Sequence, residues 1–522
     1  MELAVIGAID RATKSRRNEV YRFGTALIFI VGVMLFTGLQ AQNVPGGIML
    51  VVAAMIGGYM ALNIGANDVA NNVGPAVGSA ALTLSGAIII AAIFETSGAL
   101  IAGGDVVGTI KSGIIDPAAI GDSDEFIWMM TGALLAGAVW LNVATAIGAP
   151  VSTTHSIVGG VLGAGIAAGG WGIANWSQLG AIAASWIISP VLGGAIAAGF
   201  LYLIKRTISY DADRVAAARR VVPMLIALMA WAFVTYLILK GVKQVWNTGF
   251  PLAALLGLVA AFAVYAAVQP LIHRVRIDPE DGKRGVNDLF TLPLIFAAAL
   301  LSFAHGANDV ANAVGPLAAI SDALLHATIA AKVGIPTWVM LVGALGISLG
   351  LALYGPKLIR TVGSEITELD KTRAYCIAMA AAITVIVASQ LGLPVSSTHI
   401  AVGGVFGVGF LREHIKNSYA RAIDSIRDHH HGEDQSTVDA FLVRFEAAPF
   451  EQKAVMLKQL KEKAATAQLS KSERKGLRRV YRQELVERTV LLKIAAAWVI
   501  TVPVSAVLAG LFYFTLRGMM LP

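Results

Sequence analysis

Two short polar stretches in strongly apolar surroundings carry side chains of the types that can bind ions. Each holds two asparagines and one aspartate after an apolar run: Asn67, Asp68 and Asn71 in the first, and Asn308, Asp309 and Asn312 in the second. A carboxylate at membrane depth is costly and marks a functional site by default. Carboxylate and amide oxygens suit hard cations. Candidate Na⁺ ligands are therefore Asp68, Asp309, Asn71 and Asn312. The alternative is that these residues cap a helix end.

A second pair of stretches is rich in hydroxyl groups. Proline precedes both, and the hydroxyl residues are Ser152, Thr153 and Thr154 in one and Ser396, Ser397 and Thr398 in the other. Proline ends a segment, and serine or threonine caps the next helix. A helix N-terminus offers free N–H groups and positive potential, which favour an anion. Two such ends predict a clamp for a tetrahedral oxyanion, and capping without a ligand is the alternative.

Three further ionisable side chains belong to the predicted pathway. Glu95 lies in the middle of an apolar run, where a carboxylate is costly. His155 and His399 directly follow the hydroxyl residues, where they could donate to the anion, carry a coupling proton or simply pack. Two aspartates beside an anion would repel it unless cations screen them, so ion and anion binding should be coupled. Na⁺ or H⁺ could supply that charge.

An internal repeat relates these stretches. The run 65–75 recurs at 306–316 with one difference, Asn72 against Ala313. The run 150–155 recurs at 394–399, and Val-Gly-Gly follows each copy. The offsets are 241 and 244 residues, which makes the two halves nearly collinear. Duplication of every candidate ligand therefore indicates two copies of one unit.

Composition places these units in a membrane. The chain has 522 residues, 56% of them hydrophobic and 14% charged, where a soluble protein carries about 25% charged residues. Basic residues gather near the N-terminus, in loops and near the C-terminus, which argues against nucleic-acid binding. No Walker A, HExxH or paired CxxC pattern occurs, so the sequence does not predict an ATP-driven pump or an enzyme.

Charge and hydropathy predict an all-α polytopic fold with about 12–13 transmembrane segments, some broken or re-entrant. Basic stretches at 11–22, 205–220, 273–284 and 411–490 are placed in the cytoplasm. Counting crossings then gives two units of opposite orientation, the inverted repeat of secondary transporters. The N-terminus is predicted to be cytoplasmic and the C-terminus periplasmic, in a bacterial inner membrane.

The chain divides into seven predicted parts. They are a cytoplasmic tail (1–22), an extra first span (23–47), membrane repeat 1 (48–204), a two-helix bridge (205–286), membrane repeat 2 (287–411), a cytoplasmic helical insertion (412–488) and the last span of repeat 2 (489–522). The run 429–431 is three histidines, which we interpret as a polar turn rather than a metal site.

These motifs resemble those of the inorganic phosphate transporter (PiT) family. The resemblance rests on the two GANDVAN stretches, the two PVS(T/S)TH stretches, Phe94-Glu95-Thr96 and the run 108–114. It implies phosphate uptake driven by Na⁺ or H⁺ through inverted repeats. It also implies ligands among the matched residues, with phosphate bound by Ser152, Thr153, Thr154, Ser396, Ser397, Thr398, Asn67 and Asn308. The form Gly-Ala-Asn-Asp resembles the sodium-coupled branch.

The expected function is therefore phosphate symport by alternating access. Its expected partners are inorganic phosphate, Na⁺ or H⁺ and membrane lipid, with a second copy of the chain as a candidate, and no organic cofactor or nucleic acid. The alternatives are a permease for another tetrahedral oxyanion, such as sulfate or arsenate, and a passive channel or sensor of the same fold.

Overall fold

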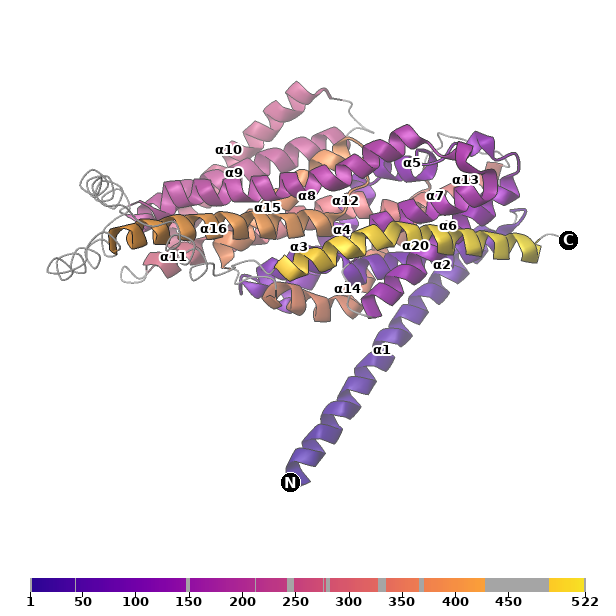
Figure 1. The fold of residues 1–522 in the computed structure, drawn as a ribbon, viewed down its shortest axis with the longest axis horizontal. Helices are drawn as coiled ribbons and strands as arrows, with labels where there is room; N and C mark the ends of the chain where they lie inside the picture. Colours follow the sequence, from indigo (N-terminus) through magenta and orange to yellow (C-terminus); the bar gives the residue numbers. More distant parts are fainter. Residues whose placement is uncertain are drawn as a thin grey trace.

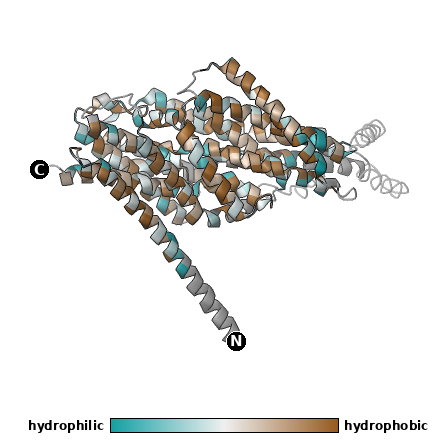
Figure 2. Ribbon diagram, turned by 180° about the vertical axis from the view of Figure 1, so that it is seen from behind, coloured by the Kyte–Doolittle hydropathy of each residue, from teal (hydrophilic) through white to brown (hydrophobic). Residues whose placement is uncertain are grey.

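Long helices dominate the molecule. The computed structural model describes residues 2–42, 44–146, 151–211, 213–241, 248–275, 277, 282–326, 335–365, 370–427 and 488–520. Within them the only β-structure is an isolated bridge between Ile115 and Ala174. Hydrophobic residues run along the helices (Figure 2), and eleven of the described spans are long and apolar enough to cross a membrane. The predicted all-α polytopic fold is confirmed.

The first half contains seven α-helices. They are α2 (Gly47–Asn67), α3 (Val69–Gly78), α4 (Leu84–Ala102), α5 (Gly104–Ser112), α6 (Ser123–Ala146), α7 (Thr153–Gly169) and α8 (Trp176–Ile204). The second half contains α12 (Thr291–Asp309), α13 (Ala311–His326), α14 (Thr337–Glu365), α15 (Lys371–Gln390), α16 (Ser397–Arg427) and α20 (Arg488–Met520). The helices match in order, except that α5 has no counterpart among the described helices of the second half.

The remaining helices flank or join the halves. They are α1 (Glu2–Gln40), which packs against α2 and α14, α9 (Arg214–Lys240) and α10 (Phe250–Arg274), which pack together, and the short α11 (Gly282–Leu289). The start of α1 extends away from the bundle (Figure 1). The predicted insertion at 412–488 begins within α16, and most of it, including the three histidines, lies outside the described residues.

Each half contains a re-entrant helical hairpin. In hairpin 1, formed by α6 and α7, the two arms run antiparallel, because Gly160 of α7 lies against Ala133 of α6. The chain before α6 pairs with the chain after α7 through the Ile115–Ala174 bridge, so both arms end at one face of the bundle. In hairpin 2, formed by α15 and α16, Gly404 lies against Ile377 in the same way. The two hairpins lie toward opposite ends of the molecule (Figure 1).

The hairpins explain the number of spans. The crossing count from the sequence includes two short segments, 156–170 and 400–411, which lie in α7 and α16. Neither of these helices is among the eleven candidate spans, whereas the first arms of the hairpins, α6 and α15, are long and apolar enough to be counted there. An arm that returns to its own face adds no crossing. Because each hairpin replaces two crossings with none, the inverse orientation of the halves is unchanged.

The two halves pack through each other rather than side by side. Helix α2 of the first half lies on α14 of the second, and α12 of the second lies on α4 of the first. A Cβ atom added at Gly65 would lie 1.9 Å from the carbonyl oxygen of Ile347, and one at Gly306 would lie 2.2 Å from that of Glu95. Only glycine fits at such distances. These glycines therefore allow the backbones of the two halves to touch.

Candidate functional site

The paired aspartates lie where two helices are joined. Helix α2 ends at Asn67 and α3 begins at Val69, with Asp68 in the joint between them. In the second half the break comes one residue later, because α12 ends at Asp309 and α13 begins at Ala311. The interruption is slight, because the backbone N–H groups of Asp68 and Val310 still bond to the carbonyls of Ile64 and Gly306, at 2.9 and 3.4 Å. Both aspartates are 1% exposed, so each carboxylate is fully inside the protein.

The hydroxyl motifs form the tips of the two hairpins. The Oγ atom of Ser152 accepts the backbone N–H of His155 at 3.1 Å and caps α7. Ser396 accepts the N–H of His399 at 3.3 Å at the start of α16. The predicted helix starts are therefore confirmed at both positions. The N-termini of α7 and α16 carry positive potential into the centre of the bundle.

Both hairpin tips meet at Asp68. Thr153 of hairpin 1 donates its hydroxyl to Oδ2 of Asp68 at 2.8 Å. Thr398 of hairpin 2 donates to Oδ1 at 3.2 Å. On the other side, Ser397 donates to Oδ2 of Asp309 at 3.2 Å. One carboxylate therefore joins the tips of two elements that are about 240 residues apart in the chain.

The inner asparagines connect the halves. The amide of Asn71 donates to Thr398 of the second half at 2.9 Å. The amide of Asn312 donates to Thr153 and Thr154 of the first half, at 3.1 and 3.2 Å. Each half thus supplies an amide to the other's hairpin tip. The structure brings these predicted residues together in one site.

The outer asparagines hold the hairpins. Asn67 donates to Thr145 of α6 at 2.8 Å, and Asn308 donates to Ser389 of α15 at 2.9 Å. The Oδ1 atom of Asn308 also accepts the backbone N–H of Val395 at 3.2 Å. These amides face hairpin residues, and their role as phosphate ligands stays a prediction. The sequence analysis did not single out Thr145 and Ser389.

Glu95 reaches the site through a histidine that the sequence analysis missed. Its Oε2 atom lies 2.7 Å from Nδ1 of His305, whose Nε2 atom lies 2.7 Å from Oδ2 of Asp309. Asn72 donates to Oε1 of Glu95 at 2.7 Å. All these side chains are buried. A signal for His305 was present, because it stands one helical turn before Asp309 inside an apolar run.

Three ionisable side chains lie close enough to share one cation. Asp68, His305 and Asp309 each offer one ligand atom, and these atoms lie within 4.8 Å of one another. Two further oxygens, Oδ1 of Asp309 and Oδ1 of Asn312, are buried without a hydrogen-bond partner in the described part of the chain. Buried polar atoms normally have a partner. The donor set is mostly oxygen and acidic, which fits a hard cation.

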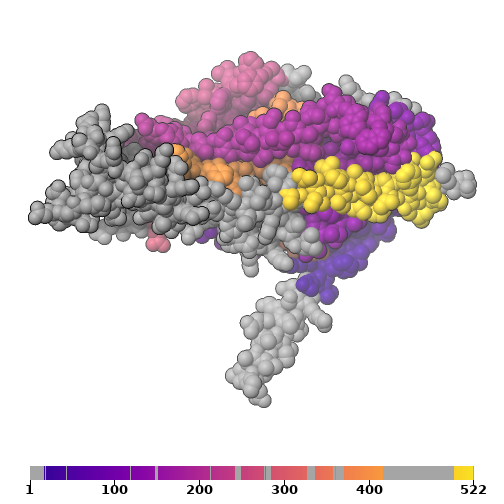
Figure 3. Space-filling model, in the orientation of Figure 1, coloured from indigo at the N-terminus to yellow at the C-terminus, as the bar shows by residue number. Residues whose placement is uncertain are grey.

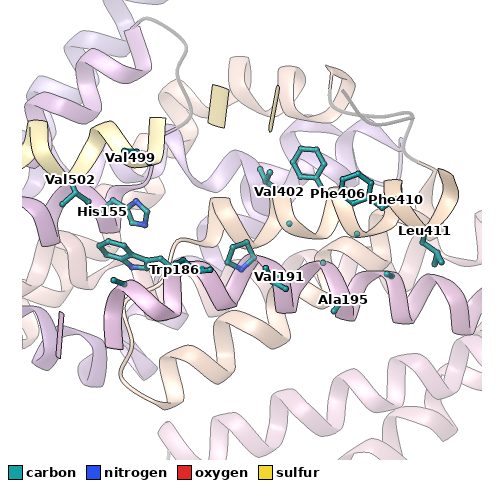
Figure 4. A pocket seen from close by; sticks show the side chains of 17 residues that line it. His155, Trp186, Val191, Ala195, Val402, Phe406, Phe410, Leu411, Val499 and Val502 are labelled. Carbon is teal, nitrogen blue, oxygen red and sulfur yellow. The ribbon is translucent and has the colours of Figure 1, made fainter. Parts of the chain in front are cut away.

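The two motif histidines lie together on another side of the hairpin tips. The rings of His155 and His399 are 4.7 Å apart, and His155 packs on Trp186 with ring centroids 3.8 Å apart. His155 and Trp186 lie at one end of an apolar groove between α8, α16 and α20 (Figure 4). Trp186 also donates to the carbonyl of Pro394 at the tip of hairpin 2, at 3.0 Å. These contacts pack the rings against hairpin 2.

Known proteins are similar to this chain in sequence and in fold. Residues 64–509 match the model of the phosphate transporter family. Two Helicobacter pylori proteins named "Putative phosphate permease" are 52% and 51% identical, each match covering 99% of both chains. A Pyrococcus abyssi protein of the same description is 39% identical over 70% of this chain and 89% of its own. A solved structure, "The sodium-dependent phosphate transporter", matches with a TM-score of 0.73 and 31% identity, over 91% of this chain and 100% of that chain.

Proposed function

The chain belongs to the phosphate transporter family, whose members are transporters rather than enzymes, and from that premise we propose that it takes up inorganic phosphate together with Na⁺. The observation that carries the proposal is the meeting of both hairpin tips at Asp68, through Thr153 and Thr398. Two capped helix N-termini and their hydroxyls there surround a buried acidic centre. A tetrahedral anion fits such donors, provided that cations neutralise the aspartates.

Competition for the same hydroxyls would couple the two ions. A hydroxyl has a single proton, so Thr153 and Thr398 can donate to phosphate only by turning away from Asp68. A cation on Asp68 would replace them as the partner of that carboxylate. Cation binding would thus release the donors that the anion needs. The effect is reciprocal, because phosphate binding should tighten cation binding by the same factor.

Sodium is the coupling ion that the donor set favours. Carboxylate and amide oxygens of Asp68, Asp309 and Asn312 suit a hard cation, and Asn71 lies beside them. The solved relative is described as sodium-dependent, which agrees with this choice. Protonation of the same carboxylates is the competing explanation, which the experiment below separates.

The inverted arrangement of the two hairpins supports transport by alternating access. The site residues are buried, so phosphate cannot reach them from either face without a conformational change. The hairpins are rooted at opposite ends of the bundle (Figure 1), and moving one or the other would open the site to one face at a time. Hairpin 2 is rooted at one face of the bundle. The described helix ends at that face are rich in arginine, including Arg206, Arg220 and Arg284. We place that face in the cytoplasm of a bacterial inner membrane, with the C-terminus periplasmic.

Uptake by purified protein in liposomes tests the proposal. We expect an inward Na⁺ gradient to drive accumulation of labelled phosphate, and a K⁺ gradient to drive none. Unlabelled sulfate should compete poorly if the clamp is selective for phosphate. Accumulation that ignores Na⁺ and follows a pH gradient would show proton coupling instead. Downhill flux without any cation dependence would show a channel, and no flux under either gradient would contradict transport.

A further inference from the structure

A buried ion pair joins α5 to α13 outside the site described above. The Nζ atom of Lys111 lies 3.0 Å from Oδ2 of Asp322, and the side chains are only 7% and 6% exposed. Burying two charges costs as much as their attraction returns, and apolar residues of similar volume often stabilise a protein as well or better. A buried pair is therefore weak evidence of a stabilising role, and a role as a switch is the best-attested alternative.

One face of α13 connects this pair to the site. Asn312, Gly315, Ala319 and Asp322 are spaced so that they share a helix face, and Asn312 and Asp322 are about 15 Å apart along the axis. A Cβ atom added at Gly315 would lie 2.9 Å from the Cβ atom of Ile110. Helix α5 therefore covers α13 between the ion pair and the hairpin tips.

The pair lies at the face where hairpin 1 is rooted. Lys111 and Asp322 line a small crevice with Pro117, with Phe126 at the start of α6 and with Ala319. Phe126 and Pro117 belong to the segment that enters hairpin 1. The crevice thus lies near this face, and Ala319 is its lining residue on α13 nearest to Asn312 in the sequence. Parting of α5 from α13 would extend it to the site.

Helix α5 also contacts hairpin 2, which moves in the proposed cycle, and helix α9. Its Thr109 donates to the carbonyl of Gly392 in the tip of hairpin 2 at 2.7 Å, and its Asp105 pairs with Lys240 of α9. Among the described residues, the arrangement occurs in one half only. The repeat offset of 241 places Ala81 where the second half has Asp322 (322 − 241 = 81). A device without a twin can control one face independently of the other.

We propose that Lys111 and Asp322 form the gate between this face and the central site. The gate is closed when α5 lies on α13. When the helices part, Asp322 is released and the ammonium group of Lys111 becomes the first cationic partner of an incoming phosphate. The gate rests on the proposed transport function, since it controls access to the same site.

A reversible cross-link tests the gate directly. Ile110→Cys with Gly315→Cys, in a Cys376→Ser background, places two thiols across the contact of α5 with α13, directly beside Lys111 and about two helical turns from Asp322. The two Cβ atoms would be 2.9 Å apart, which is shorter than the roughly 3.5–4.5 Å of a disulfide, so the helices must separate slightly to accommodate the bridge. Oxidation should stop phosphate uptake by the double variant, and a reducing agent should restore it. Oxidation should not change the rate of either single variant. An oxidised double variant that transports at its reduced rate would overturn the proposal.

An apolar replacement separates gating from a structural role. Lys111→Met with Asp322→Leu should unfold at the same temperature or higher, yet take up phosphate about tenfold more slowly, because an apolar contact does not admit water or attract the anion. A purely structural pair would lose stability and rate together, or neither. Ala319→Cys reports the gate state, because its side chain is buried behind the pair. Asp322→Asn should speed its labelling by an impermeant maleimide, and unchanged labelling would contradict the gate.

These outcomes differ from failure of the proposed function. If unmodified protein shows no sodium-driven uptake, the transport proposal fails, and the maleimide labelling still reports whether α5 and α13 part. If unmodified protein transports and the cross-link has no effect, only the gate fails.

Discussion

Asp68 and Asp309 occupy matched joints in the two halves, but their surroundings differ. Asp309 has His305 beside it, and Glu95 lies behind the histidine. The positions that match these two residues hold Ile64 and Ile347, as the paired glycine contacts at Gly65 and Gly306 show. Asp68 instead accepts hydroxyls from both hairpin tips.

The difference shows what the repeat preserves and what it does not. Contacts that build the scaffold occur twice, such as the hydrogen bonds of Asn67 with Thr145 and of Asn308 with Ser389. The charged chain from Glu95 to Asp309 occurs once. Asn72, which differs between the otherwise identical motifs, donates to that same Glu95. The single mismatch between the motifs therefore lies at the place where the halves have diverged in charge.

Removing either carboxylate should have the largest effect. Asp68→Asn and Asp309→Asn should each reduce sodium-driven uptake by roughly 100-fold or more, about 2.7 kcal/mol, because each loses a cation ligand and its charge. Both variants should still insert in the membrane. Uptake by reconstituted protein measures the effect. A variant with near-normal uptake would show that only the other aspartate serves the coupling ion.

Removing the charge of Glu95, which contacts Asp309 through His305, should have an intermediate effect. Glu95→Gln keeps the shape and an acceptor for Asn72 but removes the charge next to His305. The half-saturating Na⁺ concentration should rise about tenfold, since a hydrogen bond to a charged group contributes about 1.5–3 kcal/mol. Sodium titration of initial uptake rates measures it.

Two further variants sharpen this test, one as a control for packing and one as a test of the histidine's part. Ile347→Leu changes the matched residue of the other half without altering charge and should leave sodium dependence unchanged. His305→Gln should mimic Glu95→Gln. If His305→Gln had normal sodium dependence and Glu95→Gln did not, the glutamate would act without the histidine. Glu95, His305 and Asp309 would then not act as one unit.

The hairpin caps should respond equally in both halves, because their geometry is matched. Ser152→Ala and Ser396→Ala each remove the acceptor of a helix N-terminal N–H. Each should lower the free energy of unfolding by about 1 kcal/mol and raise the phosphate concentration for half-maximal uptake. Thermal unfolding and phosphate titration measure the two effects. Glycine at the same positions, which costs only a few tenths of a kcal/mol as a cap, is the matched control. Unequal losses would show that the symmetry does not extend to the caps.

The smallest effect on uptake is expected at a contact between matched residues of the two halves. The hydroxyls of Thr96 and its counterpart Ser348 lie 2.7 Å apart and bond to each other. Thr96→Val should lower the free energy of unfolding by about 0.5–1.5 kcal/mol and change uptake less than twofold. Ser348→Ala should match it. A large transport defect from either change would mean that this contact moves during the cycle.

The duplicated features could be predicted from the sequence, whereas of the unique features only Glu95 was predicted. The matched motifs, the helix starts at Ser152 and Ser396 and the inverse orientation of the halves follow from local chemistry and a repeat that can be counted. His305 was missed because one histidine in an apolar run has no twin to support it. The pair of Lys111 and Asp322 depends on a contact across 211 residues, which no local pattern reports. The sequence predicts broken or re-entrant segments but still counts the hairpin arms as crossings, because length alone cannot tell an arm that returns from one that spans.

The exchange of asparagines between halves has a consequence for how such a protein can arise. Asn71 serves the tip of hairpin 2, and Asn312 serves the tip of hairpin 1. A lone unit would lack the amide that its own hairpin requires. An unduplicated ancestor could complete this centre only by pairing with a second copy inserted upside down in the same bilayer. Fusion of two such copies would let each half diverge from the other, and the contacts of Glu95 and His305 beside Asp309, which Asp68 lacks, are a difference of that kind.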